Sequence, residues 1–471
     1  MCPRVSGSGS GVVIRVGFAR IAVNFVEFIG GIARAEGVVM NRTAQCLFGA
    51  LSLTAFVTGC SGSTSAPSTT GEAKSSLSRD TAPNVAPADQ QTLVSSNNAF
   101  AFDAYKALGA GNSNNEFFSP YSISSALAMT YAGAKGPTAS EMATALHFTL
   151  PQTTLHPAFD AVDLALASDN QPATDKGKPL TLHIANSMWG ETSETFGKPF
   201  LDTIATSYGA GVRLADFVNQ PDPSRIAIND WVSDQTNAKI TDLIPKGDID
   251  SSTKMVLVDA IYFDGNWSTP FDAAQTKPAQ FTKNDGTQVS ASMMTNGEVE
   301  ALFASTATYD AVELPYVGNV SMDIVMPKQG TLSAFESTLS GDAFQTIVSS
   351  LKADTGVVSI PKFSYHGDTI SLKTLLGGLG MVTAFTKAAD FSPMAPSDKI
   401  MIGDVLHKAF LSVDENGTEA AAATAVIGVG TAARLGTPPS IVVDHSFLFT
   451  LRDRPTGTIL FAGRINDPSQ P

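Results

Sequence analysis

The spacing of apolar residues changes along the chain from a helical to a strand-like period. In the first half it predicts helices over the ranges 93–109, 120–134 and 224–243. The last of these helices has an expected apolar face of Ile226, Trp231 and Ile240. Beyond Lys254 the apolar runs become short and rich in β-branched and aromatic residues, which predicts strands over 255–263, 309–317, 320–327, 357–363, 447–453 and 456–465.

Helices gathered early and strands gathered late are typical of an α+β domain. Several predicted strands are apolar almost throughout, so we expect a large sheet that is buried on both faces. Between about Thr92 and Pro468 there is no second linker and no internal repeat. The pattern therefore predicts one large domain over 92–468.

A signal-like segment precedes this domain. From Met40 the chain has a positive residue, Arg42, and then an apolar run over 46–57 that is too short to span a bilayer comfortably. Val57-Thr58-Gly59-Cys60 ends the run and resembles the lipobox of bacterial lipoproteins, in which the cysteine is lipidated. This resemblance implies a signal peptide over 40–59 and a lipid anchor on Cys60. The alternative is an ordinary secretory signal with a coincidental cysteine.

The same resemblance implies export across the inner membrane. The exported protein would then be anchored at the cell envelope or be extracellular. Ser61, which follows the cysteine, is compatible with sorting to the outer membrane. Residues 1–39 lie upstream of the signal, so we expect Met40 to be the true start and 1–39 to be a mis-annotated extension. Residues 60–91 are dominated by Ser, Thr, Ala and Pro without an apolar period, which predicts a flexible tether.

Composition limits the possible partners and chemistry. The formal net charge is −14, which disfavours nucleic acid and heparin-type polysaccharides as partners. All three cysteines lie at or before Cys60, so the domain contains neither a disulfide nor a thiolate metal site. We expect no cofactor, no bound metal and a monomer.

A series of motifs then points to a family. In chain order they occupy 115–123 (NEFFSPYSI), 131–134 (YAGA), 229–232 (NDWV), 258–267 (VDAIYFDGNW), 313–316 (ELPY), 360–363 (IPKF), 414–422 (DENGTEAAA), 445–449 (HSFLF) and 459–464 (ILFAGR). In order and spacing these motifs resemble those of the serpins, the serine protease inhibitors, over 92–468. The resemblance implies a serpin fold of three β-sheets and about nine helices, with an exposed reactive-centre loop at about 415–440.

The loop sequence suits an inhibitor. A serpin loop that has been cut inserts as a new central strand of the main sheet, which excludes proline and penalises bulk on the inward face. No proline occurs between Asn416 and Thr437, and one face would carry only small or β-branched residues, namely Thr418, Ala420, Ala422, Thr424 and Val426. By resemblance the hinge of the loop consists of Glu415, Gly417, Thr418, Glu419, Ala420, Ala421 and Ala422. Gly417 would supply backbone freedom, and Glu415 would make a charge contact whose partner the sequence does not identify.

These residues favour an irreversible suicide inhibitor that traps a protease as an acyl-enzyme. The alternative is a non-inhibitory serpin-fold binding or chaperone protein that is cut only as a substrate. The segment Glu419–Ala423 is also a strong helix former, so part of the exposed loop could be helical.

The scissile bond is expected within 429–436. Counting from the hinge places it at Thr431–Ala432, whereas counting back from Phe447 gives Leu435, with Arg434 as a second bait residue. Small residues suit an elastase- or subtilisin-like protease, and arginine suits a trypsin-like one. The expected target is a serine protease, with cysteine proteases as a second class.

The chain also contains residues that resemble a catalytic set. No G-x-S-x-G or H-E-x-x-H motif is present, so a hydrolase is the least favoured reading and we expect no enzyme activity. By resemblance Ser119, Ser122, Asp259 and His407 form the serpin "shutter" beneath the main sheet, and Trp267 lies at the "breach" where the loop first enters. The family usually has asparagine in place of Asp259. A carboxylate there could hold His407 protonated and make sheet opening pH-dependent, or it could be a simple isostere.

Overall fold

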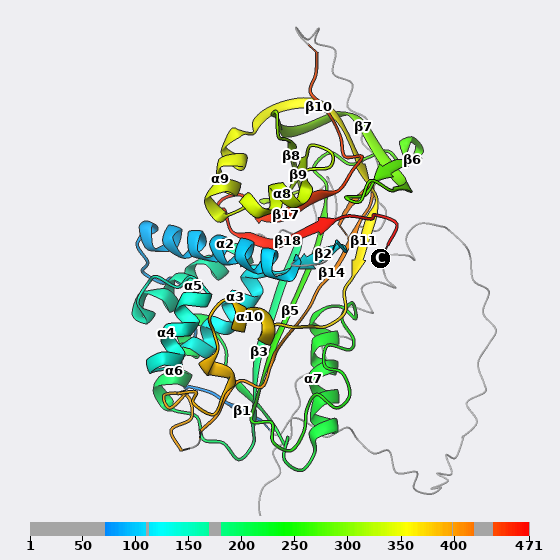
Figure 1. Cartoon of the computed structure of the whole chain (residues 1–471). Coiled ribbons are helices and arrows are strands. Elements are labelled where there is room, and N and C mark those ends of the chain that lie inside the picture. The colour runs from blue at the N-terminus through cyan, green and yellow to red at the C-terminus, as the bar shows by residue number, and fades with distance from the viewer. Residues whose placement is uncertain (1–70, 110–112, 169–179, 398, 419–436, 471) are drawn as a thin grey trace, which may run out of the picture. The chain divides into compact units, whose positions relative to one another are not determined.

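The computed structural model describes residues 71–109, 113–168, 180–397, 399–418 and 437–470 (Figure 1). Several predictions lie outside these residues: the extension 1–39, the signal 40–59, lipidation at Cys60, the first part of the tether, and the loop positions Glu419, Ala420, Ala421, Ala422, Thr431, Ala432, Arg434 and Leu435.

Nine α-helices occur among the described residues, which agrees with the number of about nine that the resemblance implied. They are α2 (Pro87–Gly109), α3 (Pro120–Tyr131), α4 (Gly136–Ala145), α5 (Gln152–Ala167), α6 (Lys198–Tyr208), α7 (Pro221–Gln235), α8 (Leu332–Thr338), α9 (Gly341–Ser350) and α10 (Lys373–Gly378). Two short 3-10 helices, η1 (Ala273–Gln275) and η2 (Thr383–Phe385), complete the helical elements.

The first sheet has the order β1-β4-β3-β5-β15-β14-β11, with β13 pairing β5 and β12 pairing β13. Its strands are β1 (Glu72–Ala73), β3 (Thr181–Glu191), β4 (Val212–Ala215), β5 (Met255–Asn266), β11 (Phe363–His366), β12 (Ile370–Ser371), β13 (Val405–Lys408), β14 (Phe410–Val413) and β15 (Gly417–Thr418). We call it the main sheet.

The second sheet has the order β16-β10-β7-β8-β9-β17-β18-β2, with β6 added to β7. Its strands are β2 (Glu116–Phe118), β6 (Lys277–Thr282), β7 (Gln288–Ser305), β8 (Tyr309–Pro315), β9 (Val320–Pro327), β10 (Lys352–Pro361), β16 (Ser440–Val442), β17 (Phe447–Asp453) and β18 (Ile459–Ile465). The long strand β7 joins two parts that the prediction counted as separate sheets.

Strand β5 shows why the main sheet is buried on both faces. Its alternate residues Val256, Val258 and Ala260 belong to a core cluster that includes Ile228 and Val232 of α7. On the other face of β5, where α3 lies, the residues Met255, Leu257, Ile261 and Phe263 belong to the larger core (Figure 1). Two-residue alternation therefore sends one set of side chains toward α7 and the other toward α3.

Helix α3 begins at a well-defined cap and is buried along its whole length. Ser119 is the N-cap and its Oγ accepts a hydrogen bond from the Ser122 N–H, while Pro120 occupies the first turn, where its missing N–H costs nothing. All twelve residues of α3 are buried. This cap fixes both serines beneath the main sheet.

One prediction about α7 is wrong. The helix ends at Gln235, and Ile226, expected on its apolar face, is 41% exposed. The buried positions are instead Ile228 and Val232, which pack on the main sheet. Ile240 is buried but lies beyond the end of the helix.

The tether prediction is also wrong from residue 71 onward. Glu72 and Ala73 form β1, which pairs antiparallel with β4 at the edge of the main sheet. Arg79 makes ion pairs with Asp160 (Nε to Oδ1, 2.7 Å) and Asp163 (Nη2 to Oδ2, 2.5 Å), both in α5. A Ser- and Pro-rich composition indicates only that a segment has a weak local preference for helix or strand. The pairing of β1 with β4 and the ion pairs of Arg79 hold the segment 71–86 in place, and we call this segment the strap. Helix α2 follows it from Pro87.

Within the described residues no helix is long and apolar enough to cross a membrane. The same residues contain no cluster of three or more His, Cys, Asp or Glu side chains placed to hold a metal ion.

Candidate functional site

The hinge forms a tight hairpin between β14 and β15. The Asp414 side chain accepts hydrogen bonds from the N–H groups of Asn416 (2.8 Å) and Gly417 (3.3 Å), and the Asp414 N–H donates to the Gly417 carbonyl (2.9 Å). After this turn, Thr418 pairs with Val413 of β14 on one side and with Gly265 of β5 on the other. Gly417 and Thr418, near the start of the loop, thus already form a strand inside the main sheet.

Gly417 is required here for two reasons. Its φ is +153°, in the region that residues with a Cβ rarely adopt. A Cβ would also lie 2.0 Å from the carbonyl oxygen of Gly265. The predicted need for glycine at this hinge position therefore comes from close packing against β5 as well as from backbone freedom.

The structure identifies the charge partner of Glu415 that the sequence left open. Lys362 Nζ donates to Glu415 Oε2 (2.7 Å), and Thr276 Oγ1 donates to Glu415 Oε1 (2.7 Å). Burial raises the pKa of Glu415, but the hydrogen bonds from Lys362 and Thr276 outweigh it, so that the net pKa lies below its usual value. The carboxylate is therefore held in its charged form at the start of the hinge.

Trp267, which the resemblance assigns to the breach, lies beside the hinge turn. Its indole stacks on Tyr316 (centroids 4.3 Å apart, planes at 18°) and its Nε1 donates to the Asp414 carbonyl (2.9 Å). The Tyr316 hydroxyl shares a hydrogen bond of 2.7 Å with Thr418 Oγ1. Burial raises the pKa of Tyr316, so this hydroxyl stays neutral. Two aromatic side chains thus hold both ends of the Asp414–Thr418 turn.

Ser119 and Ser122 link α3 to both sheets. Ser119 Oγ donates to the Leu460 carbonyl of β18 (2.7 Å), and the Ser119 N–H donates to Nε2 of His407 (3.2 Å). Ser122 Oγ donates to Asn186 Oδ1 on β3 (2.9 Å), and Asn186 Nδ2 donates back to the Ser122 carbonyl (3.0 Å). Asn186 is a member of this cluster that sequence reasoning missed.

Asp259 and His407 face each other across the boundary between β5 and β13, which we call the seam. They are register partners in this parallel pairing, and both residues have 0% exposure. His407 Nδ1 lies 3.4 Å from Asp259 Oδ1, close enough for electrostatic attraction but without hydrogen-bond geometry. Both carboxylate oxygens and Nδ1 are therefore buried without a hydrogen-bond partner among the described residues.

This geometry argues against the hypothesis of a protonated His407. Because Nε2 accepts a hydrogen bond from the Ser119 backbone, it carries no hydrogen. The ring is then neutral with its hydrogen on Nδ1, which faces Asp259.

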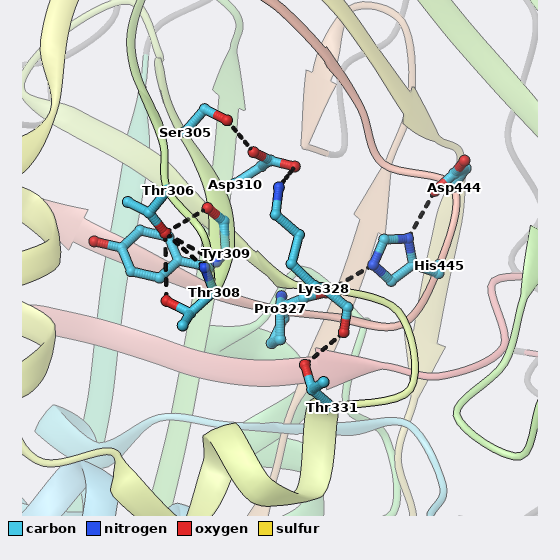
Figure 2. A network of polar contacts seen from close by, with 10 residues as sticks. All are labelled: Ser305, Thr306, Thr308, Tyr309, Asp310, Pro327, Lys328, Thr331, Asp444 and His445. Atoms are coloured by element: carbon cyan, nitrogen blue, oxygen red, sulfur yellow. Dashed lines mark hydrogen bonds and ion pairs between the residues drawn. The ribbon is translucent and has the colours of Figure 1, made fainter.

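The remaining conspicuous histidine, His445, anchors the chain where it leaves the loop (Figure 2). Its Nδ1 lies 2.7 Å from Asp444 Oδ1 and its Nε2 lies 2.7 Å from the carbonyl oxygen of Pro327. The adjacent Lys328 pairs with Asp310 (2.7 Å). With both ring nitrogens engaged, His445 is not placed to act as a general base, and His407 is fully buried. Neither histidine supports the hydrolase reading.

Comparisons with known proteins agree with this geometry. The family model described as "Serpin (serine protease inhibitor)" matches residues 95–468. The leukocyte elastase inhibitor of Xenopus laevis is 35% identical over 387 residues, which cover 80% of this chain and all of that protein.

Two solved structures are similar as well. The thermophilic serpin tengpin in its native state has a TM-score of 0.72 at 27% identity, covering 84% of this chain and 97% of that one. Thyroxine-binding globulin in complex with thyroxine has a TM-score of 0.69 at 29% identity, covering 80% and 100%. The chain belongs to the serpin family, which confirms the predicted fold. The family contains many protease inhibitors, and thyroxine-binding globulin shows that it also contains a member that binds thyroxine.

Proposed function

We propose that this chain is an inhibitory serpin, an irreversible suicide inhibitor of a serine protease. The observation that carries the proposal is the position of β15. This strand lies between β14 and β5 next to Gly265, whereas further along the main sheet β13 pairs directly with β5. The loop enters the sheet at the point where a cut loop would continue. Thr418 is already fully buried in this position.

The sequence beyond Thr418 supports continued insertion. A central strand must donate its N–H groups to both neighbours, and the segment from Thr418 to Thr437 contains no proline. Roughly ten new strand hydrogen bonds, at a net value of 0.5–1.5 kcal/mol each, give on the order of 10 kcal/mol. This gain is comparable to the stability of a whole domain, so the uncut protein would be metastable and persist for kinetic reasons.

The chemical step belongs to the protease. Its catalytic serine attacks the carbonyl carbon before the scissile bond, forms an ester with that residue, and releases the new amino terminus on the other side of the cut. Insertion of the freed segment then carries the acylated protease away from the geometry that hydrolysis of the ester requires. We place the bond at Thr431–Ala432, with Arg434–Leu435 as the second candidate.

Incubation with a panel of proteases tests this proposal. Elastase, subtilisin and trypsin are each mixed with the inhibitor and analysed on denaturing gels. A complex that survives SDS with at least one protease is expected, and mass spectrometry of the released C-terminal fragment identifies the bond. Cleavage with every protease and no stable complex would instead support the binding or chaperone alternative.

We further propose that Cys60 is lipidated and anchors the protein at the cell envelope. The support is the lipobox-like segment Val57–Cys60 and the Ser/Thr-rich sequence after it. Expression in a Gram-negative host with a radiolabelled fatty acid tests this. The wild-type protein should take up label and fractionate with membranes, and Cys60→Ala should do neither.

A further inference from the structure

His445 connects the segment that follows the loop to the end of β9 (Figure 2). Its Nδ1 lies 2.7 Å from Asp444 Oδ1, and its Nε2 lies 2.7 Å from the carbonyl oxygen of Pro327. Both distances are at the short end of the range for N–H···O hydrogen bonds. A carboxylate and a peptide carbonyl only accept hydrogen bonds, so each ring nitrogen must donate one. The ring therefore carries hydrogen on both nitrogens and is positively charged.

The charged groups around the ring are consistent with this state. Asp444 precedes the ring in the chain, and Asp310 of β8 lies close enough to it for electrostatic attraction. Two lysines border the small hollow beside the ring, Lys328 directly after β9 and Lys283 directly after β6. Lys328 Nζ lies 2.7 Å from Asp310 Oδ2, and Lys283 Nζ lies 3.9 Å from Asp285 Oδ2. Each lysine thus faces a carboxylate of its own, and Asp444 balances the charge of the ring.

The strand that leaves the loop, β16, is held by few backbone bonds. It is three residues long and lies at an edge of the second sheet, where it pairs with β10. Directly after it, the Val443 N–H donates to the Ser359 carbonyl of β10 (2.8 Å), and the Asp444 carbonyl accepts from the Thr282 N–H of β6 (2.8 Å). His445 adds a side-chain bond to a third strand, β9. The end of β16 therefore depends on the contacts of this one side chain.

We propose that His445 is a pH-sensitive clamp on β16. In its charged form the ring bridges Asp444 and Pro327 and fixes the end of the strand. The side chain is 14% exposed, so it can exchange a proton with solvent. When rising pH removes one hydrogen, one ring nitrogen presents a lone pair to an oxygen 2.7 Å away, so that bond is lost and β16 loosens. The clamp acts on the attachment of the loop, whether or not the loop inserts into the main sheet.

Nitrogen-15 NMR of the protein labelled on histidine tests the charge of the ring. The chain has six histidines, and His445→Gln identifies the signals of His445 by their absence. At about pH 7.5, where free histidine is mostly neutral, both ring nitrogens of His445 should give the chemical shifts of N–H groups. Free histidine in the same buffer supplies the neutral reference. A neutral pattern for His445 at this pH would overturn the proposal.

Hydrogen exchange of the segment 440–446 at about pH 7 and about pH 9, corrected for the intrinsic exchange rate, tests the clamp itself. The protection of wild type should fall at least about tenfold at the higher pH, because a hydrogen bond of a charged group is lost, while protection in β5 stays the same. His445→Gln cannot titrate, so its protection should be equal at both pH values.

Asp444→Asn is the matched variant, because its amide can donate to the bare Nδ1 of a neutral ring. It should therefore keep both bonds of His445 and retain its protection at about pH 9. If wild type keeps its protection at that pH, or if Asp444→Asn loses as much as wild type, the ring does not hold β16 and the proposal is overturned.

Discussion

Glu415 and Lys362 form an ion pair of 2.7 Å that fastens the first residue of the hinge to the connection between β10 and β11. The Glu415 side chain is 11% exposed and the Lys362 side chain 39%, so solvent screens the pair only in part. The pair fixes the turn from which the loop enters the main sheet.

We expect this ion pair to stabilise the intact protein and to weaken in acid. The pKa of Glu415 in the folded protein lies below its usual value of 4.5. The ion pair therefore contributes fully to the free energy of unfolding above pH 4.5, and this contribution is lost as the pH falls through the pKa of the folded protein. Glu415→Gln and Lys362→Met should each reduce the stability of the intact form by about 1 kcal/mol at pH 7. Thermal unfolding of both single variants and the double variant measures the coupling, and strictly additive losses would show that the pair contributes nothing.

Gly417→Ala should disrupt the hinge. The added Cβ would approach the Gly265 carbonyl oxygen at 2.0 Å and would also be strained at a φ of +153°. We expect a loss of at least about 2 kcal/mol in the intact form and a shift from inhibition toward substrate behaviour. Gly297→Ala is the control, because a Cβ there meets nothing within 4 Å. Equal trapping of protease by both variants would contradict the close packing of β15 on β5.

The strap should contribute stability through Arg79. Removing its guanidinium leaves Asp160, whose side chain is 1% exposed, buried without its cation. Arg79→Gln should therefore cost about 2 kcal/mol and expose 71–86 to limited proteolysis. Lys198→Gln removes an ion pair whose lysine is 76% exposed and should therefore cost much less than Arg79→Gln. Indistinguishable melting temperatures for the two variants would show that the strap does not hold the domain.

His156 should make the domain less stable in mild acid. Burial lowers its pKa to about 4 from a usual value of 6.5, and its Nδ1 lies 2.8 Å from the Tyr208 hydroxyl. As the pH falls, His156 is protonated in the unfolded chain at a higher pH than in the folded protein. The free energy of unfolding is therefore unaffected by His156 above pH 6.5, and it falls by about 3 kcal/mol in total as the pH drops toward 4. His156→Asn should flatten this part of the stability profile, whereas the exposed His183→Asn should not. An unchanged profile in His156→Asn would place the acid sensitivity elsewhere.

Residues that share a motif were predictable, whereas their partners on distant strands were not. The motifs located Ser119, Trp267 and Gly417, because these residues occur in segments with a recognisable order and spacing. Asn186 was missed because a single polar residue in a predicted strand carries no signal until pairing places it beside Asp259.

The strap illustrates the same limit. The composition of a segment indicates whether it has a local preference for helix or strand. It does not indicate an ion pair such as Arg79–Asp160, which joins residues 81 positions apart. Lys362 lay within a recognised motif, yet only the folded chain shows that it pairs with Glu415.

The stability of the protein before and after a single cut in the loop tests the central claim most directly. The protein is clipped within 429–436 by a protease that it does not trap, and intact and clipped forms are heated while their circular dichroism is followed. We predict that the clipped form unfolds at a markedly higher temperature, because the freed segment has become a strand of the main sheet. The same unfolding temperature for both forms would mean that the loop does not insert, and would contradict the assignment as an inhibitor.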